Sequence, residues 1–110
     1  MMQRKPLRPI DFRTLKEQVP IERVLELMGC KPVRLRGTEL RGPCPVHKSS
    51  SETSQTFGVN TERNAFKCFK CGAYGNQLDL AAYHFGIEQG QIVRASVRLC
   101  RELGIEVPRT

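Results

Sequence analysis

The stretches CPVH (residues 44–47) and FKCFKCGAYGN (residues 66–76) decide how this chain folds. Each contains two metal-binding side chains separated by two residues. The four side chains are Cys44, His47, Cys68 and Cys71. A gap of two residues lets both members of a pair reach one ion from a single tight turn, and a tetrahedral zinc ion takes four such ligands. The two pairs therefore predict a closed site of three thiolates and one imidazole, which is typical of a structural zinc ion.

A redox dithiol and a disulfide framework are the alternatives for five cysteines. A lone C-x-x-C motif is compatible with redox chemistry, whereas two matched pairs favour zinc. The sequence shows no signal peptide and no run of roughly 20 apolar residues, so we expect a cytoplasmic protein without a membrane partner, in which thiols stay reduced. Cys30 and Cys100 are expected to pack in the interior, and His84 to lie on a polar helix face rather than bind metal.

The charge is unevenly distributed. The chain of 110 residues, enough for one small domain, has a formal net charge of +7. Residues 31–70 hold eight basic and three acidic side chains, a local charge of 8 − 3 = +5. Such an excess favours a polyanionic partner, although a basic surface without such a partner remains the alternative.

Apolar periodicity and turn residues predict helices on both sides of the cysteine pairs and short strands between them. The expected helices span residues 11–18, 20–29, 76–86 and about 89–103. The expected strands form one hairpin within residues 32–45, turning at Gly37-Thr38, and a second made of residues 57–60 and 64–69. Residues 1–10 are expected to form a flexible basic arm, and residues 47–56 a loop. The fold class is therefore a small α+β domain.

Strand alternation in residues 64–69 sends Phe66 and Cys68 to one face and Lys67 and Phe69 to the other. A lysine beside an aromatic ring on an open sheet suits a single-stranded nucleic acid, because the ring stacks on a base and the ammonium meets a phosphate. The alternative is that Phe69 packs beneath a helix. Arg34 and Arg36 are expected to share a face of their strand. The stripe formed by Arg94, Arg98 and Arg101 on the last helix is more typical of a solvated surface.

Three motifs carry a resemblance to a known family: LRGTELRGPCPVH, F-x-C-F-x-C-G-x-x-G-N and LCRELGIEVP. With them, residues 11–108 resemble the Cys-His-Cys-Cys zinc-binding domain of bacterial replicative DNA primases. The resemblance implies a zinc-ribbon antiparallel sheet flanked by two N-terminal and two C-terminal helices. It also implies that the domain binds single-stranded template and helps to choose where a primer starts. The family's template contacts map onto Arg41, Lys67 and Lys70.

The sequence departs from the family in two ways. The segment KSSSETSQTF (residues 48–57) is longer than its counterpart and lacks a proline, so Lys48 is only a replacement candidate for a template contact. The printed chain contains aspartate only at Asp11 and Asp79, and so lacks the carboxylate cluster with which primase polymerase domains hold metal ions. We therefore expect no catalytic residue here and catalysis from a separate polymerase or helicase.

Three functions remain open at this point. The first is a primase-type module that binds single-stranded DNA. The second is a zinc-finger regulator that reads duplex DNA, and the third is a protein-interaction adaptor. For the first we expect eight nucleic-acid-binding residues: Arg34, Arg36, Arg41, Lys48, Arg63, Lys67, Phe69 and Lys70.

Overall fold

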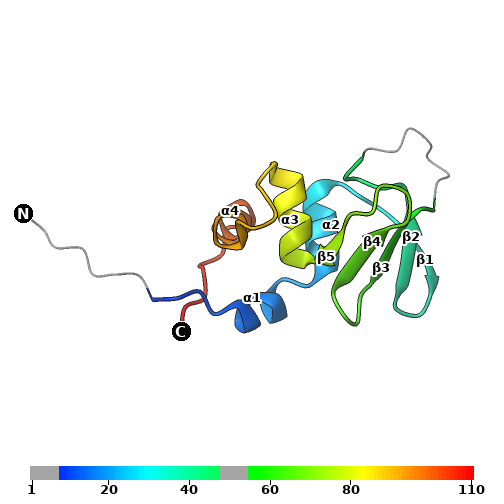
Figure 1. Cartoon of the computed structure of the whole chain (residues 1–110). Helices are drawn as coiled ribbons and strands as arrows, with labels where there is room; N and C mark the ends of the chain where they lie inside the picture. Colours follow the sequence, from blue (N-terminus) through cyan, green and yellow to red (C-terminus); the bar gives the residue numbers. More distant parts are fainter. Residues whose placement is uncertain (1–7, 48–54) are drawn as a thin grey trace, which may run out of the picture.

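The computed structural model describes residues 8–47 and 55–110 of the chain. Within these ranges the elements follow the order α1 (Phe12–Gln18), α2 (Ile21–Met28), β1 (Val33–Arg36), β2 (Glu39–Gly42), β3 (Phe57–Asn60), β4 (Ala65–Cys68), β5 (Tyr74–Asn76), α3 (Gln77–Phe85) and α4 (Ile92–Leu103). The sheet occupies one end of the molecule and α4 lies toward the other, with α2 and α3 between them (Figure 1). The predicted α+β class, with two helices before the sheet and two after it, is confirmed.

The helix ends follow the local signals in the sequence. The Asp11 carboxylate accepts a hydrogen bond from the Thr14 amide at 3.1 Å, which caps α1. At the start of α3, Asn76 and Asp79 form a reciprocal capping box. Helices α2, α3 and α4 each end on a glycine with φ between 68° and 72°, a backbone conformation that side chains other than glycine disfavour.

The five strands form one antiparallel sheet in the order β1-β2-β3-β4-β5. Strand β5 was not predicted, because three residues containing a glycine show no alternation and lead directly into α3. The pairing of β1 with β2 shifts register between Arg34 and Arg36. The shared face of these two arginines stays a prediction, because the side chain of Arg34 lies outside what the structure describes.

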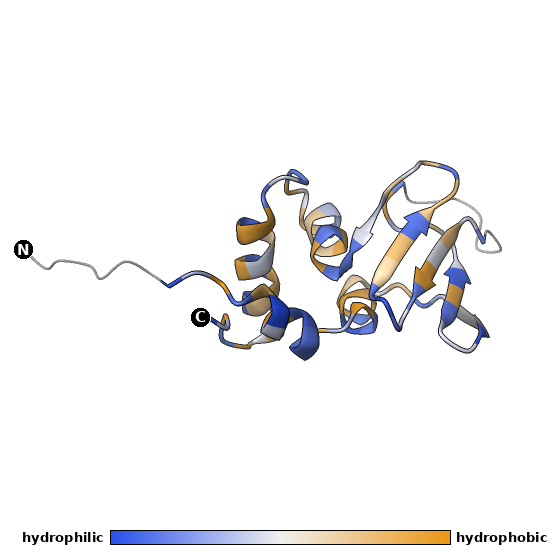
Figure 2. Cartoon of the chain, turned by 60° about the horizontal axis from the view of Figure 1, so that its bottom comes forward, coloured by the Kyte–Doolittle hydropathy of each residue, from blue (hydrophilic) through white to orange (hydrophobic). Residues whose placement is uncertain are grey.

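One face of the sheet packs against the helices. Phe57, Val59 and Phe66 are buried on this face, and the Phe66 ring meets the Tyr83 ring of α3 edge-on at 6.1 Å between centroids. These residues join one continuous core with Leu15, Ile21, Val24, Leu78, Leu80 and Leu99. Coloured by hydropathy, the ribbon shows apolar segments alternating with hydrophilic ones along the strands (Figure 2). The opposite face of the sheet is open to solvent.

The two ends of the described chain lie together. Ile10 pairs with Arg109, and the Thr110 amide donates a hydrogen bond to the Pro9 carbonyl at 3.0 Å. Residues 1–7 of the predicted basic arm lie outside the described residues, but Pro9 and Ile10 belong to the folded structure. No helix in the described ranges is long and apolar enough to cross a membrane.

Candidate metal centre and open sheet face

The four predicted metal ligands meet at one end of the sheet. Cys44 and His47 lie just beyond β2, Cys68 is the last residue of β4, and Cys71 lies in the turn that follows. Their ligand atoms all fall within 4.8 Å of one another. The antiparallel pairing of β2, β3 and β4 brings the two pairs together, because it places the end of β2 near the end of β4.

The distances within this cluster fit a tetrahedral ion. The Sγ atoms of Cys44 and Cys71 are 3.9 Å apart, and Cys68 Sγ lies 3.5 Å from His47 Nδ1. Zinc bonds of about 2.3 Å to sulfur and about 2.0 Å to nitrogen give tetrahedral edges of about 3.8 Å and about 3.5 Å. These two distances match tetrahedral edges, and the four ligand atoms, all within 4.8 Å of one another, lie close enough to surround one zinc ion and fill its four positions.

The surroundings of the two ring nitrogens of His47 indicate which of them would bind the ion. Nδ1 faces the thiol of Cys68, while Nε2 is buried and has no hydrogen-bond partner among the described residues. Nδ1 is therefore the atom placed to bind the ion, and Nε2 would carry the ring proton.

Backbone amides point at two of the sulfur atoms. The amide of Val46 donates to Cys44 Sγ at 3.3 Å, and the amides of Lys70 and Cys71 donate to Cys68 Sγ at 3.4 Å each. These donors stabilise thiolates, which are the form that binds zinc.

Burial and these amides act in opposite directions on the two thiols. Burial raises the pKa of the Cys44 thiol to about 12, against the smaller effect of the His47 and Val46 amides. Burial would also raise the pKa of Cys68, but hydrogen bonds from the Cys71 and Lys70 amides, and from the neighbouring thiols, lower it to about 6. Without metal, Cys68 is therefore the thiol that ionises first of this coupled pair.

The open face of the sheet carries an aromatic ring between two cations. Phe69 is 61% exposed, so the interpretation that it packs beneath a helix is wrong. The Arg41 guanidinium lies 4.8 Å from the centre of the Phe69 ring, and Lys67 Nζ lies 5.3 Å from it. The predicted alternation of β4 is confirmed, since Phe66 and Cys68 are buried whereas Lys67 is exposed.

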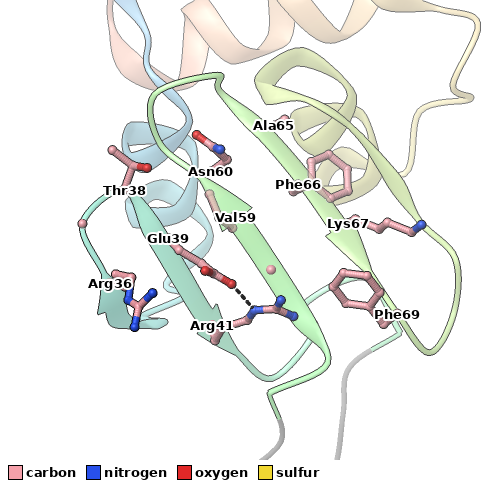
Figure 3. Close-up of a pocket in the computed structure, with 12 residues that line it drawn as sticks. Arg36, Thr38, Glu39, Arg41, Val59, Asn60, Ala65, Phe66, Lys67 and Phe69 are labelled. Atoms are coloured by element: carbon pink, nitrogen blue, oxygen red, sulfur yellow. Dashed lines mark hydrogen bonds and ion pairs between the residues drawn. The ribbon is translucent and has the colours of Figure 1, made fainter.

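A hollow of about 630 Å³ lies on this face over β2, β3 and β4 (Figure 3). Its lining includes Arg36, Glu39, Arg41, Asn60, Lys67 and Phe69. The strand register sets this arrangement, because Arg41 lies opposite Gly58 and Gly58 lies opposite Lys67. Gly58 has no side chain, so the Arg41 guanidinium can lie over β3 at this position.

The other predicted nucleic-acid contacts are scattered. Arg63 is exposed in the turn between β3 and β4, and Lys70 is exposed between the two cysteines of its knuckle. Neither lines the hollow. Lys48 and the side chain of Arg34 lie outside what the structure describes.

Tyr74 was not among the residues predicted from the sequence. It is 72% exposed and pairs with Lys67 across β4 and β5, which places it beside one of the two cations of the open sheet face. The aromatic residue within GAYGN was a usable signal, but that segment was expected to lead into a helix rather than to form a strand.

The remaining candidates behave as predicted. Cys100 is buried, and Cys30 is half-buried against the core. His84 is exposed, with its ring 5.1 Å from Phe85. On α4, the Arg98 side chain donates to Glu102 at 2.9 Å and lies over Phe85 at 5.0 Å, so this arginine already has local partners.

Comparisons with known proteins find a zinc finger family and DNA primases. A family model described as CHC2 zinc finger matches residues 9–110. The DNA primase of Pseudomonas putida is 38% identical over 66 residues, which are 60% of this chain and 9% of that protein. The DNA primase of Pasteurella multocida is 31% identical over 88 residues, 78% of this chain and 14% of that protein. The zinc-binding and RNA polymerase domains of the Aquifex aeolicus primase superpose with a TM-score of 0.66 at 22% identity, over 89% of this chain and 22% of that one.

Two ligand knuckles on a small antiparallel sheet define the class of zinc-ribbon proteins. The family match covers nearly the whole chain, and the chain belongs to the CHC2 zinc finger family. One zinc ion is its cofactor, in agreement with the Cys-His-Cys-Cys cluster. The family resemblance stated from the sequence is confirmed. The chain spans between 9% and 14% of the length of the two curated relatives described here.

Proposed function

We propose that this chain is a zinc-dependent DNA-binding module of DNA primase type, which binds single-stranded template and assists primer initiation during replication. The observation that carries the proposal is the exposed Phe69 ring between Arg41 and Lys67 on the open sheet face. The names of the relatives, DNA primase in each case reported, support the same function.

The chemistry of this face suits an unpaired strand. An aromatic ring stacks on any base, and stacking contributes about 1–3 kcal/mol per base. Cations beside the ring neutralise phosphates and release counterions, so their contribution to binding is sensitive to salt and carries no sequence information. When bound, zinc would supply rigidity, because Cys44, His47, Cys68 and Cys71 would tie the ends of β2 and β4 together at one end of the sheet. The open sheet therefore provides a fixed platform rather than a flexible loop.

Catalysis is assigned to another domain or chain. The two aspartates of the sequence both serve helix starts: Asp11 caps α1, and Asp79 accepts a hydrogen bond from the Asn76 amide at 2.8 Å. Neither lies on the open sheet face. A polymerase subunit or a helicase that acts with this module would supply the carboxylate-held metal ions that phosphoryl transfer uses.

The test is a titration of the zinc-loaded chain with a fluorescently labelled single-stranded oligonucleotide at two salt concentrations. We expect binding whose affinity falls steeply with salt, with a slope of about 0.7 per phosphate contact. F69A should weaken binding about fivefold or more through lost stacking. R101A, which removes a charge from the remote helix α4, is the matched control and should weaken binding less than K67A.

Other outcomes would select the other functions. Preference for one duplex sequence over single strands, lost in R94A or R101A, would favour a regulator that reads DNA through α4. No binding to any nucleic acid at low salt would reject the proposal, and a protein partner retained at high salt after nuclease treatment would then favour an adaptor.

A further inference from the structure

The Arg41 side chain is held in place before any ligand binds. Its Nε atom donates to Glu39 Oε1 at 2.8 Å, and its guanidinium lies 4.8 Å from the centre of the Phe69 ring. It also lies flat over Gly58, where an added Cβ would come within 3.2 Å of Cζ and of Nη1. Three neighbours therefore orient this guanidinium. A surface arginine ordinarily loses side-chain rotamer freedom when it binds a ligand, and Arg41 would lose less because it is already held.

The terminal nitrogens of Arg41 remain for a ligand. Within the part of the chain that the structure describes, Glu39 contacts Nε of Arg41 and not its terminal nitrogens, and 26% of the Arg41 side chain, which lines the hollow, is exposed. The guanidinium extends over β3 toward Phe69, with Glu39 behind it on its own strand (Figure 3). The two terminal N–H groups form a planar fork that matches a pair of adjacent acceptors.

We propose that this fork reads one unpaired base of the bound strand and selects cytosine or guanine. The inference rests on the proposed function and adds specificity to it. Guanine presents O6 and N7 as adjacent acceptors, and an unpaired cytosine presents O2 and N3. Adenine and thymine alternate donors with acceptors on these edges, so they satisfy only one arm of the fork.

Affinity and specificity are divided between neighbouring residues in this arrangement. Lys67 is a point charge that meets phosphate whatever the sequence, whereas Arg41 is a fixed fork that distinguishes base edges. Glu39 is a positioning residue, because it acts by holding Arg41 rather than by touching the strand. Gly58, opposite both Arg41 and Lys67 in register, has no side chain and so leaves room for the Arg41 guanidinium to lie across β3.

The experiment uses nine-nucleotide oligothymidine strands with one central base changed to cytosine, guanine or adenine. Fluorescence anisotropy at low salt gives the affinity of the zinc-loaded chain for each. We expect the cytosine and guanine strands to bind about fivefold or more tightly than the adenine and thymine strands. R41K keeps the charge but removes the fork, so the ratio between the two groups of strands should fall toward one.

E39Q provides a second variant in case R41K alters the fold. It leaves Arg41 in place but weakens the contact that orients it, so the ratio should fall while binding to all strands rises from the lost negative charge. R101K on α4 should keep the wild-type ratio. Equal affinity for the four strands, or a ratio unchanged in both R41K and E39Q, would overturn this inference alone. Absence of binding to all four strands would instead overturn the proposed function.

Discussion

The helical half of the molecule and its ribbon half are stabilised in different ways. The helical half, residues 8–29 and 77–110, buries aliphatic side chains such as Leu15, Leu80 and Leu99 completely. The ribbon half, residues 33–47 and 55–76, has strands of only three or four residues and buries two metal-binding thiols beside its few apolar side chains. A sheet that keeps one face open for a ligand buries apolar side chains on its other face only. Metal binding therefore supplies part of the stability that a second buried face would give.

The two halves are nevertheless joined. The Phe66 ring contacts Phe57 at 5.8 Å and Tyr83 at 6.1 Å, which links the sheet to α3. The Ile21 amide donates to Asn64 Oδ1 at 2.9 Å, which ties the start of α2 to the turn between β3 and β4. Whether the halves unfold together or in sequence therefore depends on how much stability each contributes.

Removal of zinc should have the largest effect. C68S eliminates the central thiolate of the cluster, and structural zinc binding contributes about 10–16 kcal/mol in zinc-finger peptides. We expect loss of stoichiometric zinc and collapse of the ribbon half, measured by elemental analysis and circular dichroism. C30S, which changes a half-buried thiol outside the cluster, is the control and should retain one zinc per chain. A C68S protein that keeps its zinc and its melting temperature would abolish the distinction between the halves.

A core substitution in the helical half should have a smaller effect on stability. L99A removes a fully buried side chain of α4 and should lower the free energy of unfolding by about 2–5 kcal/mol. Urea denaturation gives this value, and the native L99A protein should still bind one zinc per chain. If L99A lost zinc while its helical circular dichroism signal remained, the ribbon half would depend on packing in the helical half, and the two halves would not be stabilised in different ways.

Acid should weaken the ribbon half specifically. Zinc displaces protons from thiols, so its affinity falls as the pH falls. Because burial holds the pKa of Cys44 near 12, its proton must leave at every pH below that value, and this thiol alone costs about tenfold in affinity per pH unit. Below about pH 6 the proton on Cys68 adds to this dependence, and the slope steepens.

Competition with a chromophoric chelator between pH 5 and pH 8 measures this dependence. L99A serves as the comparison and should show the same slope as the wild type, since Leu99 lies in the helical half. A zinc affinity that stays constant over this range would contradict the assignment of thiolate ligands.

The sequence by itself determined the metal ligands, the fold class and most element boundaries. These features depend on local rules: the two-residue gap in each knuckle, the caps at Asp11 and Asn76, and the alternation of residues 64–69. The register shift at Arg34–Arg36 and the short strand β5 escaped prediction, because pairing with a neighbouring strand produces them and no local pattern signals them.

Only the tertiary structure decided which side chains meet on the open face of the sheet. Glu39 lies on β2, Gly58 on β3 and Phe69 in the turn after β4, and their meeting around Arg41 depends on the register of the three strands. Sequence alone left Phe69 between the core and the surface, since either face of a strand can be covered until the positions of the helices are known. The helices cover the face that carries Phe66, and Phe69 is therefore exposed.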